Sequence, residues 1–449
     1  MITDRHAHAM THTGAEAVRH YEKALDALLH FREETGAEVG ALLDDSPRSV
    51  MGHVFRAYLG LLGTEERDAA EAAAAFGAYL RDLPGSAPTP RERMHVEAAS
   101  AWLDGDMHRA GHLLAELVVA HPEDALALAV GHQIDFFTGN AVLLRDRIGG
   151  ALSAWDRDDP HYGLLQGMYA FGLEEAGHYT LAERTGLEAV ERDARDVWGI
   201  HAVVHAYEMQ GRHEDGIRYL DARTDDWASG NSLNVHNWWH YALYLLETGR
   251  TDEVLAVYDA ALHHDGSAGA AMELLDAASL LWRLHLAGTD TGGRWSALAD
   301  AWAQRRDGAH YAFNDAHAVM AYVGAGRIPE AERLVRDREM WLRDAAPELS
   351  NAAMTAGIGL PVCRALVAYG RRRYADAVEL LLPLRRRFQE FGGSHAQRDA
   401  LQRTLVEAAL HAGRHDLART LLSERIQLRA RCPYDRDAWA RLMRRQGGS

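Results

Sequence analysis

Residues 101–122 read AWLDGDMHRAGHLLAELVVAHP, and this stretch decides the fold. One apolar stripe with helical spacing comes before Gly105, and a second comes after it. Glycine suits a tight turn between two antiparallel helices, because such a turn needs a positive φ or a close approach of the backbone. Ala110 is small enough to let the second helix pack on the first. The stretch therefore predicts a helical hairpin.

The same unit recurs along the chain. Its clear turn glycines are spaced by 34, 38, 34, 38, 39 and 38 residues, at Gly105, Gly139, Gly177, Gly211, Gly249, Gly288 and Gly326. Gly105, Ala110 and Pro122 have the spacing of the 34-residue tetratricopeptide repeat, or TPR. Alternation typical of strands persists nowhere. We therefore predict an all-α, TPR-like α-solenoid in which about ten helical hairpins form one right-handed superhelix, a single domain over residues 1–449.

Composition excludes several classes of protein. No apolar leader segment opens the chain and no run approaches 18 uninterrupted apolar residues, so the sequence predicts a cytoplasmic protein without a membrane partner. Two cysteines, Cys363 and Cys432, are too few for a disulfide framework, a Cys-rich zinc site or an iron–sulfur site. Lys23 is the one lysine, which argues against Schiff-base chemistry and a phosphate-binding loop lysine.

Charge is unevenly distributed. The net charge of −17 argues against a general nucleic-acid partner. Residues 364–449, the basic C-terminal repeats, hold 18 Arg and 9 Asp plus Glu, a balance of +9 that leaves −26 for residues 1–363. The RRR runs at 371–373 and 385–387 are interpreted first as solvated helix faces. An acidic partner, or the acidic part of a second copy in a homodimer, is the alternative.

Histidine is unusually frequent, with 26 residues. Three lie in the first dozen residues, within a segment, 1–14, that we expect to be a mobile N-terminus. The others fall inside the repeats, and residues 198–211, WGIHAVVHAYEMQG, place two of them four apart. With each turn glycine set at position 15 of its repeat, positions 2, 5, 9 and 12 line the concave face. The residues that take or adjoin these positions include Trp198, His201, His205, Glu208, His236, Trp239, His240 and Trp282, and also His95 and Trp102.

Three interpretations of this belt remain open. Its histidines can be hydrogen-bonded residues of a crowded concave face, without further function. They can form a pocket for a small molecule or peptide, in which Trp supplies contact area. They can also hold a divalent metal ion or act as general acids and bases, since an i, i+4 pair of histidines can share one metal. The metal candidates are His201, His205, His236, His240 and Glu208; the catalytic candidates are His201, His205, Glu208, Asp315 and His317.

Two segments predict helix starts. In GGSHAQRD (392–399), Ser394 is the expected N-cap and Gln397 completes a capping box. In FNDAHAVM (313–320), Asn314 is the expected N-cap. Neither role explains His317, Arg398 or Asp399, so these polar residues stay candidates for a site.

Several segments together resemble a known family. They are WGIHAVVHAYEMQGR, HNWWHYALYLLETG, FNDAHAVM, GLPVCRALV, LLLPLRRR with GGSHAQRD, and LLSER, and they resemble the tetratricopeptide repeat protein 38 family. The resemblance extends from about residue 51 to about residue 425. It implies a long, irregular TPR-type solenoid of a family found in bacteria and animals, with no settled reaction or cofactor. It also implies that the histidine-bearing segments belong to the family pattern, at His201, His205, His236, His240, Asp315, His317, Gln397, Arg398 and Asp399.

The sequence thus predicts a ligand site in a concave groove rich in His and Trp. Arg398 would anchor a carboxylate or phosphate there. A binding module for a small molecule or peptide, an enzyme on a TPR frame, and a scaffold for protein partners are the three functions it leaves open. The expected ligand-binding residues are Trp198, His201, His205, His236, Trp239, His240, Trp282, Arg398 and Asp399.

Overall fold

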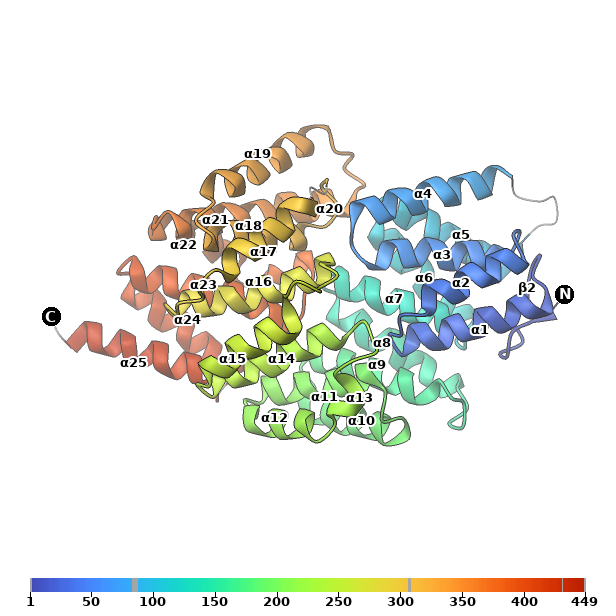
Figure 1. The fold of residues 1–449 in the computed structure, drawn as a ribbon, viewed down its shortest axis with the longest axis horizontal. Coiled ribbons are helices and arrows are strands. Elements are labelled where there is room, and N and C mark those ends of the chain that lie inside the picture. Colours follow the sequence, from blue (N-terminus) through green and yellow to red (C-terminus); the bar gives the residue numbers. More distant parts are fainter. Residues whose placement is uncertain (1, 83–87, 306–307, 430, 448–449) are drawn as a thin grey trace. The chain divides into compact units, whose positions relative to one another are not determined.

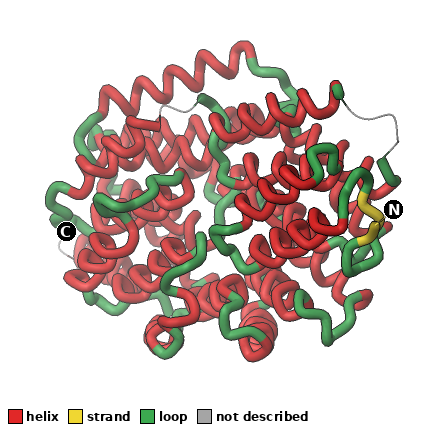
Figure 2. The backbone as a smooth tube through the Cα atoms, turned by 45° about the vertical axis from the view of Figure 1, so that its right-hand side comes forward, coloured by secondary structure: helices red, strands yellow, loops and turns green. Residues whose placement is uncertain are grey.

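Over the residues that the structure describes, the protein is all-α apart from one pair of two-residue strands. The computed structural model describes residues 2–82, 88–305, 308–429 and 431–447. Helices connected by short loops account for almost all of this chain, and the single strand pair lies near the N-terminus (Figure 2). Consecutive helices pair as hairpins of TPR type, as α21 (Leu360–Gly370) and α22 (Tyr374–Leu381) do (Figure 1). The predicted fold class is confirmed.

The contacts divide the chain into two compact units, where the sequence predicted a single domain over residues 1–449. Unit 1 is Met1–Val203 with Asp225–Asn234 and Ala346–Ser350, and unit 2 is Val204–Thr224 with Val235–Ala345 and Asn351–Ser449. The first boundary falls inside a helix, α11 (Val197–Met209), and not in a linker. Because the same helical unit repeats on both sides, the sequence carries no mark of this boundary.

Unit 1 begins with a hairpin of strands and continues as helix pairs. Its elements are β1 (Ile2–Thr3), β2 (Ala9–Met10), α1 (Ala15–Leu29), α2 (Thr35–Asp45), α3 (Val50–Leu62), α4 (Glu66–Arg81), α5 (Pro90–Leu103), α6 (Met107–Ala120), α7 (Ala125–Phe137), α8 (Ala141–Ala151), η1 (Leu152–Ala154), α9 (Tyr162–Glu175), α10 (Tyr179–Arg192) and the first half of α11. The segment α13 (Thr224–Trp227) belongs mostly to the same unit.

Unit 2 continues the series. Its elements are the second half of α11, α12 (His213–Asp221), α14 (Asn234–Glu247), α15 (Thr251–Val257), η2 (Tyr258–Leu262), α16 (Ala271–Leu286), α17 (Arg294–Arg305), α18 (Ala312–Gly324), α19 (Ile328–Asp344), α20 (Ser350–Met354), η3 (Thr355–Gly359), α21, α22, η4 (Leu382–Leu384), η5 (Phe388–Phe391), α23 (His395–His411), α24 (His415–Leu428) and α25 (Pro433–Gly447).

The turn glycines have the backbone that the repeat requires. A positive φ is found at every glycine of the predicted series and at one more near the C-terminus: Gly105, Gly139, Gly177, Gly211, Gly249, Gly288, Gly326 and Gly413. Two other turns use a different residue, since Thr64 follows Gly63 with a φ of 57° and Arg372 takes the same φ after Gly370. Glycine is therefore the usual, but not the obligatory, residue of this turn.

Of the two helix starts predicted from the sequence, one is confirmed. Ser394 accepts a hydrogen bond from the Gln397 backbone, and the Gln397 side chain accepts one from the Ser394 backbone, which is a capping box at the start of α23. The other prediction is wrong, because Tyr311 is the N-cap of α18 and Asn314 lies within that helix.

One helical run, Ser350–Gly370, is long and apolar enough to cross a membrane by length and composition alone. Of its most apolar window, 72% is buried inside the protein. A buried helix of a repeat stack is apolar for the same reason that a membrane helix is, so this run is weak evidence for a membrane.

Candidate functional site

Helix α11 carries the first pair of candidate histidines and begins at a buried acid. The Asp196 carboxylate accepts a hydrogen bond of 2.8 Å from the Gly199 backbone, as an N-cap residue does. Trp198 stacks on Phe31, with ring centroids 5.0 Å apart and an interplanar angle of 3°. Phe171 packs its ring 5.1 Å from His201. These contacts, all within unit 1, fix the first turn of the helix.

Three histidines of unit 2 come together at the candidate centre. His205, His236 and His240 each offer one ring nitrogen, and these atoms lie within 4.8 Å of one another. The His205 and His240 ring centroids are 4.4 Å apart, and those of His236 and His240 are 4.9 Å apart. We call these three residues the histidine cluster. His201 precedes His205 by one turn of the continuous helix α11, so the two project from one face of it.

Carboxylates set the tautomers of two cluster histidines. Asp276 Oδ2 lies 2.7 Å from His236 Nδ1, and Glu208 Oε2 lies 3.2 Å from His240 Nδ1. A carboxylate at Nδ1 keeps the proton there and gives Nε2 the lone pair that a metal ion requires. The sequence predicts Glu208 as a metal ligand. In the structure Glu208 contacts His240, so it would orient this histidine as a ligand. Arg429 lies 3.7 Å from the other Glu208 oxygen.

The surroundings keep His240 neutral. Burial, together with His205, His236 and Arg283, lowers the pKa of His240 well below its ordinary value. Arg283 is itself buried: it donates to the Ser279 and Ala396 carbonyls at 2.9 and 2.5 Å. Burial lowers the pKa of Arg283 to about 10, so that it stays charged at neutral pH. A neutral imidazole is the form that binds metal ions.

The predicted groove walls are not exposed. Trp239 and Trp282 are both 0% exposed, and the Trp282 indole nitrogen donates to Thr404 of α23 at 2.8 Å. His205 and His240 are also 0% exposed. These side chains are therefore enclosed, because α23 packs on α16. TPR positions identify the inner face of a helix, but they do not show what packs against it.

Asp315 and His317, the other catalytic candidates, have structural partners. Asp315 is ion-paired with Arg338 at 2.8 Å, and burial raises the pKa of Asp315. The His317 ring nitrogen Nδ1 bonds the Phe313 carbonyl at 2.8 Å, and burial lowers the pKa of His317 to about 4. Among the described residues, neither joins the group of ligand atoms around the histidine cluster.

Arg398 and Asp399 also lie apart from that group. Arg398 donates to the Gly393 carbonyl at the start of its own helix. Asp399, 1% exposed, accepts from Arg403 at 2.6 Å and pairs with Arg425 at 2.8 Å and Arg429 at 3.4 Å. Burial alone would raise the pKa of Asp399, but these arginines hold it well below its ordinary value. The carboxylate is thus the centre of a buried ion network.

The acid at the start of α11 gives a testable pH dependence. Burial raises the pKa of Asp196 from 3.8 to about 8. Between these two pKa values the folded state keeps the Asp196 proton that the unfolded state releases. The contribution of Asp196 to the free energy of unfolding is therefore complete below pH 3.8 and is lost as the pH rises towards 8. Asp196→Asn mimics the neutral acid. We expect its free energy of unfolding, relative to wild type, to gain about 1.4 kcal/mol for each unit from about pH 5 to pH 7.

Chemical denaturation of both proteins at several pH values measures this difference, and the shared titration of the histidines cancels in it. A difference that is constant with pH would show that Asp196 is ionised in the folded protein. Asp193→Asn is a suitable control, since Asp193 is half-exposed and His30, 2.9 Å away, lowers its pKa.

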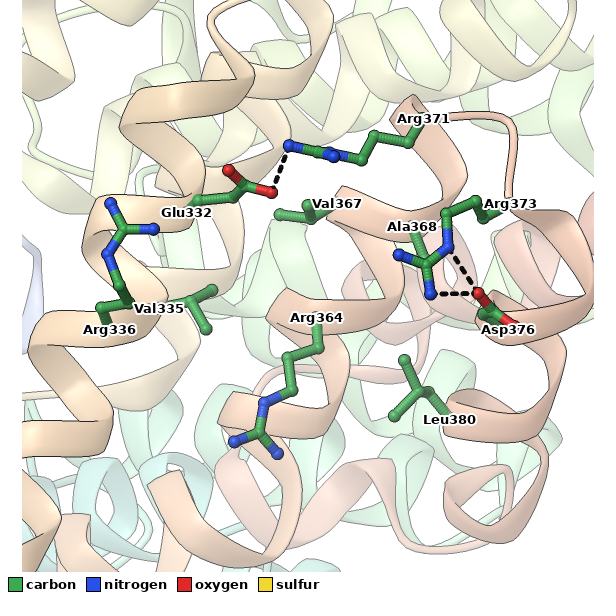
Figure 3. A pocket seen from close by; sticks show the side chains of 10 residues that line it. All are labelled: Glu332, Val335, Arg336, Arg364, Val367, Ala368, Arg371, Arg373, Asp376 and Leu380. Carbon is green, nitrogen blue, oxygen red and sulfur yellow. Dashed lines mark hydrogen bonds and ion pairs between the residues drawn. The ribbon is translucent and has the colours of Figure 1, made fainter.

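A surface hollow of about 390 Å³ lies between α19, α21 and α22, and part of its lining belongs to the basic C-terminal repeats. Four arginines line it, and Figure 3 shows two of them ion-paired with acids of the same hollow. Arg371 pairs with Glu332 at 2.6 Å, and Arg373 pairs with Asp376. Arg364 pairs outside the hollow with Glu339 at 2.7 Å. Most of this positive charge is therefore neutralised within unit 2, which favours the interpretation as solvated helix faces.

Sequence reasoning missed the residues that organise the histidine cluster. Asp276, Ser279 and Arg283 follow one another at spacings of three and four in the apolar helix α16, and all are buried. Polar residues on the apolar stripe of a helix are expected to have partners. The spacing of three and four residues, which puts these polar side chains on one face of an apolar helix, is the sequence feature that could have identified them.

No known family model matches the chain. Among solved structures, a monomeric mutant of IFIT1 with Gppp-AAAA is similar over 94% of this chain and 99% of its own, at 14% identity and a TM-score of 0.42. A human IFIT1 dimer with m7Gppp-AAAA matches over 94% of both chains, at 14% identity and a TM-score of 0.37. The APC/C hetero-tetramer Cut9–Hcn1 matches over 96% of both chains, at 11% identity and a TM-score of 0.33. The assignment to TPR-type helical repeats rests on the helix pairs and turn glycines described above.

Proposed function

We propose that this chain is a metal-binding protein that holds one transition-metal ion at the histidine cluster. His205, His236 and His240 supply three imidazole ligands. The observation that supports the proposal is the convergence of three ring nitrogens within 4.8 Å, two of them on imidazoles with a carboxylate at Nδ1. Imidazole ligands suit zinc, iron, copper and nickel.

The surroundings of the cluster match what such an ion needs. Metal-bound histidines usually donate their second N–H to a carboxylate, which raises their basicity and fixes the ring, and Asp276 and Glu208 are placed for this. Three histidine ligands leave a coordination position for water or a substrate, as in catalytic zinc sites. As an enzyme, the protein would use this site for metal-dependent catalysis. As a binding module, it would hold a small molecule at the ion.

The segments that carry these histidines also support membership in the tetratricopeptide repeat protein 38 family, which we propose on the quoted motifs. A cytoplasmic location and the absence of a nucleic-acid partner, drawn from composition and net charge, stay predictions.

Metal analysis tests the proposal. Protein purified without an affinity tag is expected to carry a first-row metal, and His205→Ala/His240→Ala is expected to carry about one equivalent less than wild type, because two ligands of the histidine cluster are gone. His112→Ala, whose side chain is 74% exposed, is the matched control and should keep the metal. Elemental analysis by mass spectrometry measures the stoichiometry, and circular dichroism checks that each variant is folded.

A milder variant separates loss of a ligand from loss of the fold. Asp276→Asn preserves shape but removes the negative charge beside His236, so we expect the metal to bind 10–100-fold more weakly, by order of magnitude. Equal metal affinity in wild type, Asp276→Asn and the double histidine variant would overturn the proposal.

A further inference from the structure

The N-terminal segment, expected from its sequence to be a mobile terminus over residues 1–14, is built into unit 1. Strand β1 pairs with β2 in antiparallel register, Ile2 opposite Met10, and Met10 is 1% exposed. Between the strands, Asp4 Oδ1 accepts hydrogen bonds from the backbone of His6 at 3.0 Å and of His8 at 2.9 Å. This tight turn presents the His6 side chain towards the body of the unit.

His6 meets the loop that leads into α9. Its Nε2 atom is buried, has no hydrogen-bond partner and lies 3.8 Å from Asp159 Oδ2. The other Asp159 oxygen accepts a hydrogen bond of 2.8 Å from the His161 backbone. Trp155 packs against the His6 ring edge to face, with centroids 4.8 Å apart. Ring and carboxylate are thus both fixed in place, one by the hairpin and Trp155, the other by the start of the helix.

His161 is the second imidazole at this place. It is 0% exposed, and neither of its ring nitrogens has a hydrogen-bond partner. Burial of an imidazole without such partners is costly, and a bound ion would offset that cost. Asp26 of α1 lies 3.6 Å from His161 Nε2, which is too far for a hydrogen bond.

We propose that His6, Asp159 and His161 bind a divalent first-row metal ion such as Zn²⁺, at a second site distinct from the histidine cluster. One ligand atom from each residue lies within 4.8 Å of the others. The 3.8 Å between His6 and Asp159 is too long for a hydrogen bond. It is close to the separation of about 3.4 Å that two ligands have around a tetrahedral zinc with bonds of about 2.0–2.1 Å.

The wider arrangement fits a site of this kind. Two imidazoles with one carboxylate form a donor set that zinc and iron accept, with a further position for water. The Asp26 carboxylate lies beside the Nε2 atom of His161, where a carboxylate that orients a metal-bound histidine is expected. An ion here would link the N-terminal hairpin to the first turn of α9, and so would hold residues 2–10 on unit 1.

Zinc titration of the full chain tests the second site. In the background His205→Ala/His240→Ala, which removes the first site, chelator-treated protein is expected to bind one equivalent of Zn²⁺ by calorimetry. Adding His6→Ala is expected to weaken this binding at least tenfold, because one of three protein ligands is lost. His112→Ala in the same background is the control for unspecific binding to exposed histidines. His6 belongs to the hairpin and not to a helix core, so its replacement tests the site with the fold intact.

Hydrogen exchange locates the ion independently of stoichiometry. Zn²⁺ is expected to slow exchange of the backbone amides of residues 2–10 in wild type and in the double histidine background, and not in Asp159→Asn. Unchanged zinc affinity on adding His6→Ala, or equal exchange of the hairpin with and without Zn²⁺, would overturn the second site. Neither result bears on the histidine cluster, since that site is absent from the background.

Discussion

Asp399→Asn is expected to lower the free energy of unfolding of unit 2 by about 3–5 kcal/mol, because it breaks a buried ion network at its centre. The Asp399 carboxylate is 1% exposed and lies within 2.6–3.4 Å of Arg403, Arg425 and Arg429. The asparagine has the same shape but no charge. The buried guanidinium groups of Arg403, Arg425 and Arg429 would then lose the negative charge that they share.

Each of these three arginines also has a second acid, which bounds the effect. Arg403 also pairs with Glu247 at 2.5 Å, and Arg425 also pairs with Asp435 at 2.5 Å. Arg429 has Glu208 at 3.7 Å, so the loss of Asp399 also shifts the charge balance beside the histidine cluster. We therefore expect Asp399→Asn to weaken metal binding there as well as to destabilise the fold.

Differential scanning calorimetry measures the change as a lower unfolding midpoint. Asp416→Asn is the matched control: Asp416 pairs with Arg419 at 3.0 Å, but its side chain is 94% exposed, and surface ion pairs contribute little. Equal midpoints for the two variants would show that the network around Asp399 is no more important than an exposed ion pair.

Trp282→Ala is expected to destabilise the protein by about 3–5 kcal/mol, the range for truncating a large buried aromatic side chain. Trp282 is 0% exposed and stacks on His285, with centroids 5.1 Å apart. Its ring also lies 5.8 Å from that of Tyr369. The cavity left by alanine would lie where α16 meets α23, and these helices cannot close it without moving their backbones.

Graded substitutions separate packing from hydrogen bonding at this position. Trp282→Phe keeps an aromatic ring, and Thr404→Val removes only the acceptor of the indole N–H, for which about 1 kcal/mol is expected. Urea denaturation of the three variants should therefore rank Trp282→Ala as the least stable. A cost for Trp282→Ala below that of Thr404→Val would mean that the tryptophan lines an open groove, as its repeat position alone suggested.

The histidine cluster was foreseen in part. The repeat frame placed His201 and His205 on one face of a helix, with His236 at a concave-face position of the next repeat and His240 beside one, and in the structure His205, His236 and His240 lie together. Glu208 was assigned to the metal, whereas it bonds His240. Asp276 and Arg283 were missed, because the repeat frame assigns faces within a helix pair and not partners from the next pair.

By itself the sequence determined the helical hairpins, their turns and the faces of their helices. These follow from local physics: glycine tolerates a positive φ, small residues admit a close helix, and apolar residues at helical spacing seek burial. Tertiary structure alone decided that Asp399 is the centre of an ion network, that Trp282 is buried under α23, and that His6 meets Asp159 and His161. Each of these depends on residues more than twenty positions apart, and such contacts are fixed by how the repeats and the N-terminal hairpin pack and not by any pattern within one repeat.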